Sequence, residues 1–142
     1  MKRRVLLVPV LMLLAVSAAF AQGLETFDNH TITGTSYVSG NFVGNNGITW
    51  NYYYVTGEQS YPIDGKGINL RRSEYPSKVY SGTISGGIGD FSLDMRKAFT
   101  STGDRQIALY VNDVHIADSK VFGAATGAQD TIHVFSVEGV NI

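Results

Sequence analysis

The side chains best suited to bind a ligand lie between residues 50 and 71 of this sequence. Tyr52 and Tyr54 alternate in the run ITWNYYYV, and polar groups follow at Asp64, Asn69 and Arg71. Flat aromatic rings stack on the C–H faces of sugars, while amide, carboxylate and guanidinium groups hydrogen-bond to sugar hydroxyls. The sequence therefore predicts a carbohydrate site formed by these residues: Tyr52, Tyr54, Asp64, Asn69 and Arg71.

A structural role is the alternative for the aromatic residues of this run. Trp50 is the sole tryptophan, and in a protein without cysteines such a ring is often the largest core residue. Tyrosines likewise seal the edge of a sheet while their hydroxyls stay in water. Strict alternation would place Trp50, Tyr52 and Tyr54 on one face of a strand. Tyr53 and Val55 would then lie on the opposite face, and the pattern does not show which face is buried.

The sequence carries no recognisable catalytic motif. The glycine-rich stretches 65–67 and 86–89 are not followed by helix-like sequence, so they do not match phosphate-binding loops. His30, His115 and His133 lack the spacing of a zinc site. Asp90 and Asp94 share one face of an expected strand, but at about 3.3 Å per residue they lie roughly 13 Å apart, too far to act as a glycosidase pair. We therefore predict that the protein is not an enzyme, with a hydrolase whose carboxylates meet only in the fold as the remaining alternative.

Two carboxylates near the start of the expected domain could hold a structural ion. Glu25 and Asp28 flank the first expected strand, and carboxylate oxygens together with backbone carbonyls are the ligands that Ca²⁺ prefers. The alternative is that both are ordinary carboxylates of a strand edge and a turn. A structural calcium at Glu25 and Asp28 is the one cofactor that the sequence predicts.

Residues 1–21 have the features of a secretory signal peptide. A basic start (Lys2, Arg3, Arg4) precedes an apolar run and a small-residue pattern that ends at Ala21. Cleavage after Ala21 predicts a secreted, extracellular protein, with the periplasm or the outer surface as alternatives, and no membrane span after it. Residues 22–142 keep all 12 acidic residues but only eight of the 11 Lys and Arg, a formal charge of −4. This acidic balance argues against nucleic-acid binding.

The stretch 84–99 contains the clearest strand pattern. Phe91, Leu93 and Met95 alternate with polar residues, which is typical of a strand with one buried and one solvated face. Further strand-like runs, separated by turns, cover residues 24–27, 48–55, 67–71, 78–84, 105–111, 114–117 and 131–137. Because no amphipathic helix is evident and the connections are short, the sequence predicts an all-β, two-sheet antiparallel β-sandwich in which other segments pair with or cover this strand.

Two connecting segments carry their own signals. Residues 31–47 are rich in Gly, Ser, Thr and Asn, so only short strands or loop residues are expected at 36–38 and 41–43. Asn112 and Asp113 fit a two-residue hairpin turn between the runs 105–111 and 114–117.

Three blocks of sequence also resemble a known kind of domain. The blocks GNNGITW (44–50), YPIDGKGINLR (61–71) and residues 81–112 are similar to an accessory domain that recurs in large secreted proteins of Gram-negative bacteria. The resemblance implies a jelly-roll-like sandwich, similar to carbohydrate-binding modules, tethered to other domains in a longer protein and without an activity of its own. Such domains normally continue through one more strand, so residues 22–142 are expected to form a single domain that lacks its last strand, unless a short terminal strand begins at Val140.

These observations predict a secreted, non-catalytic accessory module that binds a polysaccharide or another cell-surface ligand. The alternative, from a different class, is a structural or adhesive spacer domain of a larger secreted protein. A small hydrolase is the third reading.

Overall fold

The computed structural model describes residues 23–57, 60–72, 76–125 and 131–140, so the expected signal peptide 1–21 lies outside the described residues. All regular structure in these residues is β, and every strand pairing is antiparallel. The strands are β1 (Gly34–Val43), β2 (Thr49–Gly57), β3 (Asn69–Leu70), β4 (Lys78–Ser81), β5 (Phe91–Met95), β6 (Ala108–Val111), β7 (Val114–Asp118) and β8 (His133–Val137). The predicted all-β, antiparallel class is confirmed. A search of the described part of the chain finds no helix with the length and apolar character needed to cross a membrane.

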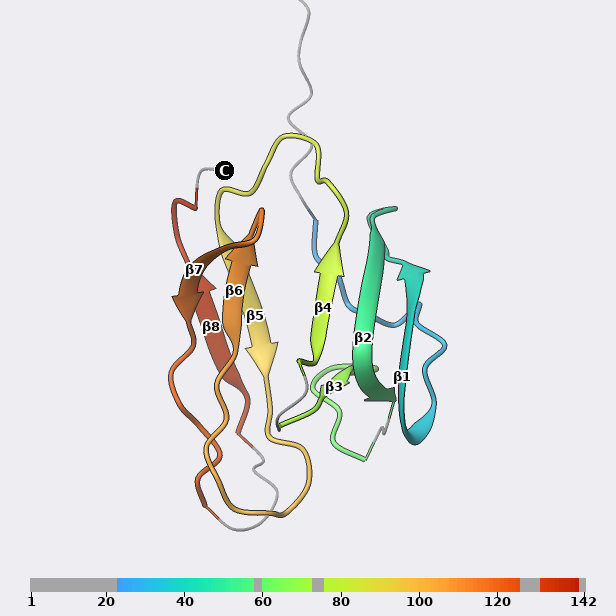
Figure 1. The fold of residues 1–142 in the computed structure, drawn as a ribbon, viewed down its shortest axis with the longest axis vertical. Helices are drawn as coiled ribbons and strands as arrows, with labels where there is room; N and C mark the ends of the chain where they lie inside the picture. Colours follow the sequence, from blue (N-terminus) through green and yellow to red (C-terminus); the bar gives the residue numbers. More distant parts are fainter. Residues whose placement is uncertain (1–22, 58–59, 73–75, 126–130, 141–142) are drawn as a thin grey trace, which may run out of the picture.

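The larger sheet is built around β2. This strand pairs with β1 along one edge and with β3 and β4 along the other. Figure 1 shows β1 and β2 on one side of the molecule, β5 to β8 on the other and β4 between them. The β-branched and aromatic residues of β2 suit this central position, because such side chains pack well on a pleated surface.

A bulge in β2 changes which side chains share a face. Trp50 lies opposite Phe42, Tyr52 opposite Gly40 and Val55 opposite Val38, so three steps along β2 match two steps along β1. Tyr54, with φ at 56°, takes up the extra residue. Val55 therefore shares a face with Trp50 and Tyr52, and Tyr54 does not. The strict alternation expected from the sequence is wrong at Tyr54 and Val55 for this reason.

The second group of strands contains the main apolar core. β5 pairs with β8, and β6 and β7 form a hairpin. Asn112 and Asp113 connect the hairpin with φ values of 51° and 62°, the left-handed conformation that a two-residue turn requires. Met95, Phe122 and Phe135 are buried together, and Phe91 and Leu93 pack against them. The predicted alternation of β5 and the predicted hairpin turn are both confirmed.

Three expectations about the strands need correction. Residues 24–27 form no strand, because Phe27 has φ at 62° and its ring packs at 5.8 Å from the ring of Trp50. This segment therefore covers one face of the larger sheet instead of joining its edge. The polar residues 34–43 form one long strand, because pairing with β2 satisfies their backbone groups. β5 pairs with β8 alone among the described strands, so it is not the centre of the sheets.

Long polar side chains and two rings connect the two groups of strands. Arg72 Nη1 donates to the carbonyl of Thr102 at 2.6 Å. Arg96 Nη1 donates to the carbonyl of Pro62 at 2.7 Å. The rings of Tyr61 and Phe99 meet edge-on, with centroids 5.2 Å apart. The loop after β5 therefore lies against the segments that flank β3.

Candidate functional site

A strip of tyrosines crosses the larger sheet on the face opposite Trp50 and Tyr52. Tyr53 pairs with Lys78 and Asn51 with Tyr80, which places their side chains on this open face. We call Tyr37, Tyr53, Tyr54 and Tyr80 the tyrosine strip. Tyr37, Tyr53 and Tyr80 are 45%, 42% and 46% exposed, values that leave much of each ring accessible to a ligand.

Arg71 joins one end of the tyrosine strip. The rings of Tyr37 and Tyr54 are stacked, with centroids 5.8 Å apart and an interplanar angle of 14°. The Arg71 guanidinium carbon lies 5.1 Å from the Tyr37 ring and 5.7 Å from the Tyr54 ring, within cation–π range of both. Tyr53 extends the group, with its centroid 5.4 Å from that of Tyr54. The arrangement offers ring faces beside a charged donor.

At the other end of the tyrosine strip, the side chain of Lys78 lies against the ring of Tyr80. Its ammonium nitrogen lies 4.9 Å from the centroid of the Tyr80 ring, again within cation–π range. A cation therefore accompanies the rings at both ends of the tyrosine strip.

Hydrogen bonds with two serine side chains, Ser39 and Ser77, fix the backbone at the bulge and at Arg71. The Tyr54 amide donates to Ser39 Oγ at 3.2 Å, across the irregular part of the β1–β2 pair. Ser77 Oγ donates to the Tyr54 carbonyl at 2.9 Å and accepts from the Arg71 amide at 3.0 Å. One hydroxyl thus connects β2 to the residue that follows β3, Arg71. The position of the guanidinium beside the rings follows from these backbone contacts.

The structure brings together two of the five predicted binding residues. Tyr54 and Arg71 are neighbours. Tyr52 lies on the opposite face, where its ring centroid is 6.5 Å from that of Phe42. Asn69 pairs with Thr56 in the short strand β3. Asp64 is exposed in the loop before β3, and among the described residues it has no contact with the tyrosine strip.

Sequence reasoning missed Tyr37 and Tyr53 as members of the site. Tyr37 lies in a segment that was expected to hold only short strands or loops, and its stacking on Tyr54 depends on a long-range strand pair. Tyr53 was expected on the face opposite Tyr54, and the bulge brings the two rings together. The signal in the sequence was the run of three consecutive tyrosines, which places aromatic rings on both faces of one strand.

The face of the sheet that carries Trp50 is covered by the segment before β1. The ring of Phe27 contacts those of Phe42 and Trp50, with centroids 6.1 and 5.8 Å away. The imidazole of His30 meets Phe42 edge-on at 6.1 Å. Phe42 and Val55 are buried here. This face is a small core, and the half-buried Trp50 belongs to it, which leaves the open face with its tyrosine strip for ligands.

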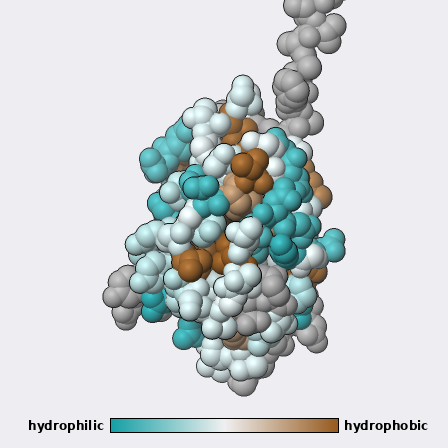
Figure 2. All heavy atoms as spheres, turned by 90° about the vertical axis from the view of Figure 1, so that its right-hand side faces the viewer, coloured by the Kyte–Doolittle hydropathy of each residue, from teal (hydrophilic) through white to brown (hydrophobic). Residues whose placement is uncertain are grey.

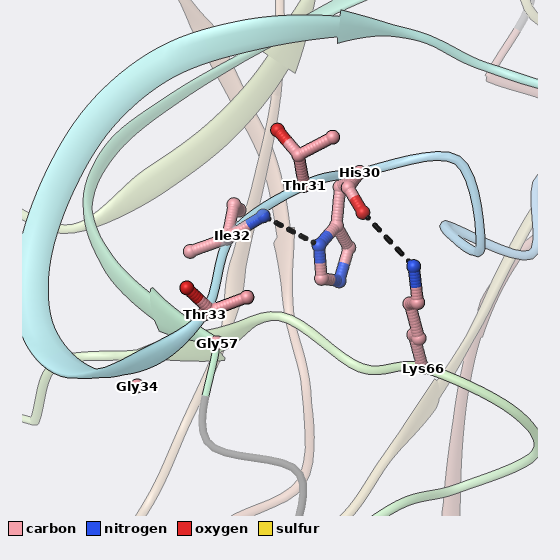
Figure 3. A pocket seen from close by; sticks show the side chains of 7 residues that line it. All are labelled: His30, Thr31, Ile32, Thr33, Gly34, Gly57 and Lys66. Carbon is pink, nitrogen blue, oxygen red and sulfur yellow. Dashed lines mark hydrogen bonds between the residues drawn. The ribbon is translucent and has the colours of Figure 1, made fainter.

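A separate hollow of about 320 Å³ lies beside His30, at the end of β2 (Figure 3). His30 Nδ1 accepts from the Ile32 amide at 3.2 Å, and Nε2 donates to the Gly67 carbonyl at 3.2 Å, so the imidazole is neutral. Lys66 Nζ donates to the carbonyls of Asp28 and His30. Burial is the main cause that lowers the pKa of His30 from 6.5. The polar groups around this hollow already form hydrogen bonds with one another, which indicates that they stabilise the fold rather than bind a ligand.

The two carboxylates predicted to bind calcium accept hydrogen bonds from backbone amides. Glu25 accepts from the amides of Phe27 and Asn45, at 2.7 and 2.9 Å. Asp28 Oδ1 accepts from the Lys66 amide at 2.9 Å, and this bond is the main cause that lowers the pKa of Asp28 from 3.8. Within the described ranges, no group of three or more His, Asp or Glu side chains is arranged to hold a metal ion. Calcium binding at Glu25 and Asp28 stays a prediction.

The side of the molecule on which β1 lies is mixed in polarity. Figure 2 shows separate apolar patches on it, surrounded by pale and hydrophilic residues. Such a surface resembles an ordinary solvated protein face with local binding features more than a broad apolar interface.

Comparison with known proteins gives no relative for this chain. No protein-family model, no curated protein and no solved structure matches it.

Proposed function

We propose that this protein is a secreted, non-catalytic binding module whose tyrosine strip and Arg71 bind a carbohydrate chain at a cell surface. The observation that carries the proposal is the group formed by Tyr37, Tyr54 and Arg71, in which ring faces lie within 5.1–5.8 Å of one another and of a guanidinium. Rings supply stacking surfaces for sugar C–H groups, and the guanidinium supplies hydrogen-bond donors for hydroxyls. Together these are the two kinds of contact that a sugar ring needs.

The extended shape of the strip supports a chain ligand rather than a single sugar. Tyr80 on β4, Tyr53 and Tyr54 on β2 and Tyr37 on β1 follow one another across three hydrogen-bonded strands. Neighbouring strands lie about 4.8 Å apart, so the strip spans roughly 10 Å, or about two sugar rings. The signal-peptide-like residues 1–21 support secretion, and the resemblance noted above supports a place beside other domains of a larger protein.

For the fold, we propose that the sheets stack as a jelly-roll-like β-sandwich. The antiparallel pairing supports this arrangement, as do the contacts of Arg72 with Thr102 and of Tyr61 with Phe99 between the two groups of strands. A crystal structure in which the Trp50 face of the β1–β4 sheet, together with the segment before β1, lies toward the strands β5–β8 and leaves the tyrosine strip open is the expected result. Sheets packed side by side, with both faces solvated, would contradict it.

Affinity electrophoresis in gels that contain soluble polysaccharides tests the binding proposal. Retardation by a bound polymer should weaken about two- to tenfold for Tyr53→Ala, because one stacked ring contributes about 0.5–1.5 kcal/mol. The matched control is Tyr110→Ala, since Tyr110 is also exposed (59%) but lies on β6. Equal weakening in both variants would place binding elsewhere. A folded protein that no polysaccharide retards would favour the spacer role.

A further inference from the structure

A second feature, a cleft lined by two arginines, lies at the Tyr37 end of the strip. A cavity of about 290 Å³ opens between β3 and the loop after β5. Its lining includes Tyr37, Leu70, Arg72, Phe99 and Arg105. The volume is close to the lower end of the range of about 300–1,000 Å³ for small-molecule sites, which suits one sugar ring. We call it the arginine cleft.

Arg72 and Arg105, which both line this cleft, also approach one another beside Gly103. A Cβ placed on Gly103 would lie 2.9 Å from Arg72 Nη1 and 3.5 Å from Arg105 Nη1. The two guanidinium nitrogens are therefore close enough for one carboxylate to accept from both, since each of its oxygens accepts at about 2.8 Å. The positive φ of Gly103 (115°) and its missing side chain keep this point open.

Backbone oxygens and the Ser101 hydroxyl hold the two arginines. Arg72 Nη1 donates to the Thr102 carbonyl, and Arg105 donates to the carbonyls of Gly103 and Asp104. In the part of the chain that the structure describes, no ion pair joins either guanidinium to a carboxylate. Burial, and after it the charge of Arg72, lowers the pKa of Arg105, and the smaller effect of the Asp104 charge opposes them. Two like charges held together cost free energy that a bound anion would offset.

The arginine cleft continues the tyrosine strip. Tyr37 lines the cleft and also stacks on Tyr54. Arg71 and Arg72 are consecutive, but their side chains contact different parts of the molecule. Arg71 lies against the rings of the tyrosine strip, and Arg72 donates to the loop at Thr102. Because Tyr37 belongs to both features, a chain bound against the Tyr37 ring would place a neighbouring sugar near the two guanidinium groups. A sugar with a carboxylate on its ring offers both the apolar face and the planar anion that this end of the site fits.

We propose that the ligand of the tyrosine strip is an acidic polysaccharide, one of whose uronate carboxylates binds to Arg72 and Arg105 in the arginine cleft. This inference rests on the proposed carbohydrate-binding function and names the class of its ligand. A guanidinium binds a carboxylate in a planar, often bidentate geometry, and a charged hydrogen bond contributes more than a neutral one. Residues 22–142 carry a net negative charge, so the rest of the surface attracts anions only weakly. Anion binding should therefore be confined to the arginine cleft.

The test uses a pair of polymers that differ only in whether each carboxyl group is free or methyl-esterified. The full-length protein is titrated calorimetrically with oligomers of polygalacturonate and with their methyl esters, at low and at high salt. The acid form should bind about tenfold more tightly than the ester, as expected for the loss of a charged hydrogen bond. Arg72→Gln should lower the affinity for the acid form to that for the ester and leave the ester affinity unchanged. Lys120→Gln, which removes one positive charge from an exposed position, should change neither affinity.

The outcomes separate this inference from the function on which it rests. Equal affinity for acid and ester, or unchanged acid affinity in Arg72→Gln, would refute uronate binding in the arginine cleft. Carbohydrate binding by the tyrosine strip would not be affected by either result. Binding of neither polymer would also refute uronate binding, and the proposed function would then survive only if neutral polysaccharides bind through Tyr53. If Arg105→Gln folds, it should repeat the Arg72→Gln result.

Discussion

Lowering the pH below 6.5 should destabilise this fold through His30. The side chain is 1% exposed, and its two ring nitrogens serve as acceptor from Ile32 and donor to Gly67. A second proton on the ring would remove the acceptor and place a charge in a buried site beside Lys66. The folded protein therefore keeps His30 neutral at pH values where the unfolded chain protonates it.

The sign and size of the effect follow from the lowered pKa of His30. The pKa in the fold lies below the unfolded value of 6.5, so below pH 6.5 the unfolded chain binds more protons. The contribution of His30 is fully present above pH 6.5 and is lost as the pH falls toward the folded pKa. Each pH unit in this window should remove at most about 1.4 kcal/mol from the free energy of unfolding. The contribution of Asp28 is lost separately, below its unfolded value of 3.8, because its pKa is also lowered.

Urea unfolding between pH 7.5 and 5, followed by the fluorescence of the sole tryptophan, Trp50, measures this dependence. His30→Gln keeps a donor and an acceptor but cannot be protonated, so its stability should vary less across this range. His115→Gln is the matched control, since His115 is exposed and pairs only with Asp118 among the described ion pairs. A slope in His30→Gln that equals the wild-type slope would refute the assignment to His30.

Three further predictions concern packing and calcium. Met95→Ala should lower the free energy of unfolding by about 2–5 kcal/mol, because Met95 is 4% exposed in the core, whereas Val134→Ala, at 64% exposure, should cost little in the same urea assay. Gly57→Ala should cost about 1–3 kcal/mol, because its Cβ would lie 2.2 Å from the Ile32 carbonyl oxygen, and Gly67→Ala, with open space around it, is the control. If Glu25 takes part in a calcium site, EDTA should lower the thermal midpoint and added Ca²⁺ should restore it; an unchanged midpoint would contradict calcium binding.

The strands with a regular pattern were predictable from the sequence alone. In β5, Phe91, Leu93 and Met95 alternate with polar residues, and the structure buries them on one side. Local periodicity is sufficient to predict this strand because one face is apolar and the other is polar. Asn112 and Asp113 were also predictable, since few residues tolerate the positive φ of a two-residue turn.

The candidate site depended on features that periodicity does not contain. The bulge at Tyr54 needs a positive φ at a residue that rarely adopts one, so only the pairing with β1 reveals it. The stacking of Tyr37 on Tyr54 and the approach of Arg72 to Gly103 join segments that are distant in the sequence. Residue type alone predicted that Tyr54 and Arg71 bind a ligand, and the structure places these two side chains side by side.

The most direct test of the central claim is a glycan-array screen of the purified protein, with the double variant Tyr37→Ala/Tyr53→Ala and the control Tyr110→Ala beside it. All three proteins are first shown to unfold cooperatively at similar urea concentrations. We predict saturable binding to a set of polysaccharides by the wild type and by Tyr110→Ala, and loss of that binding in the double variant. Unchanged binding in the folded double variant would contradict the assignment of the tyrosine strip as the carbohydrate site.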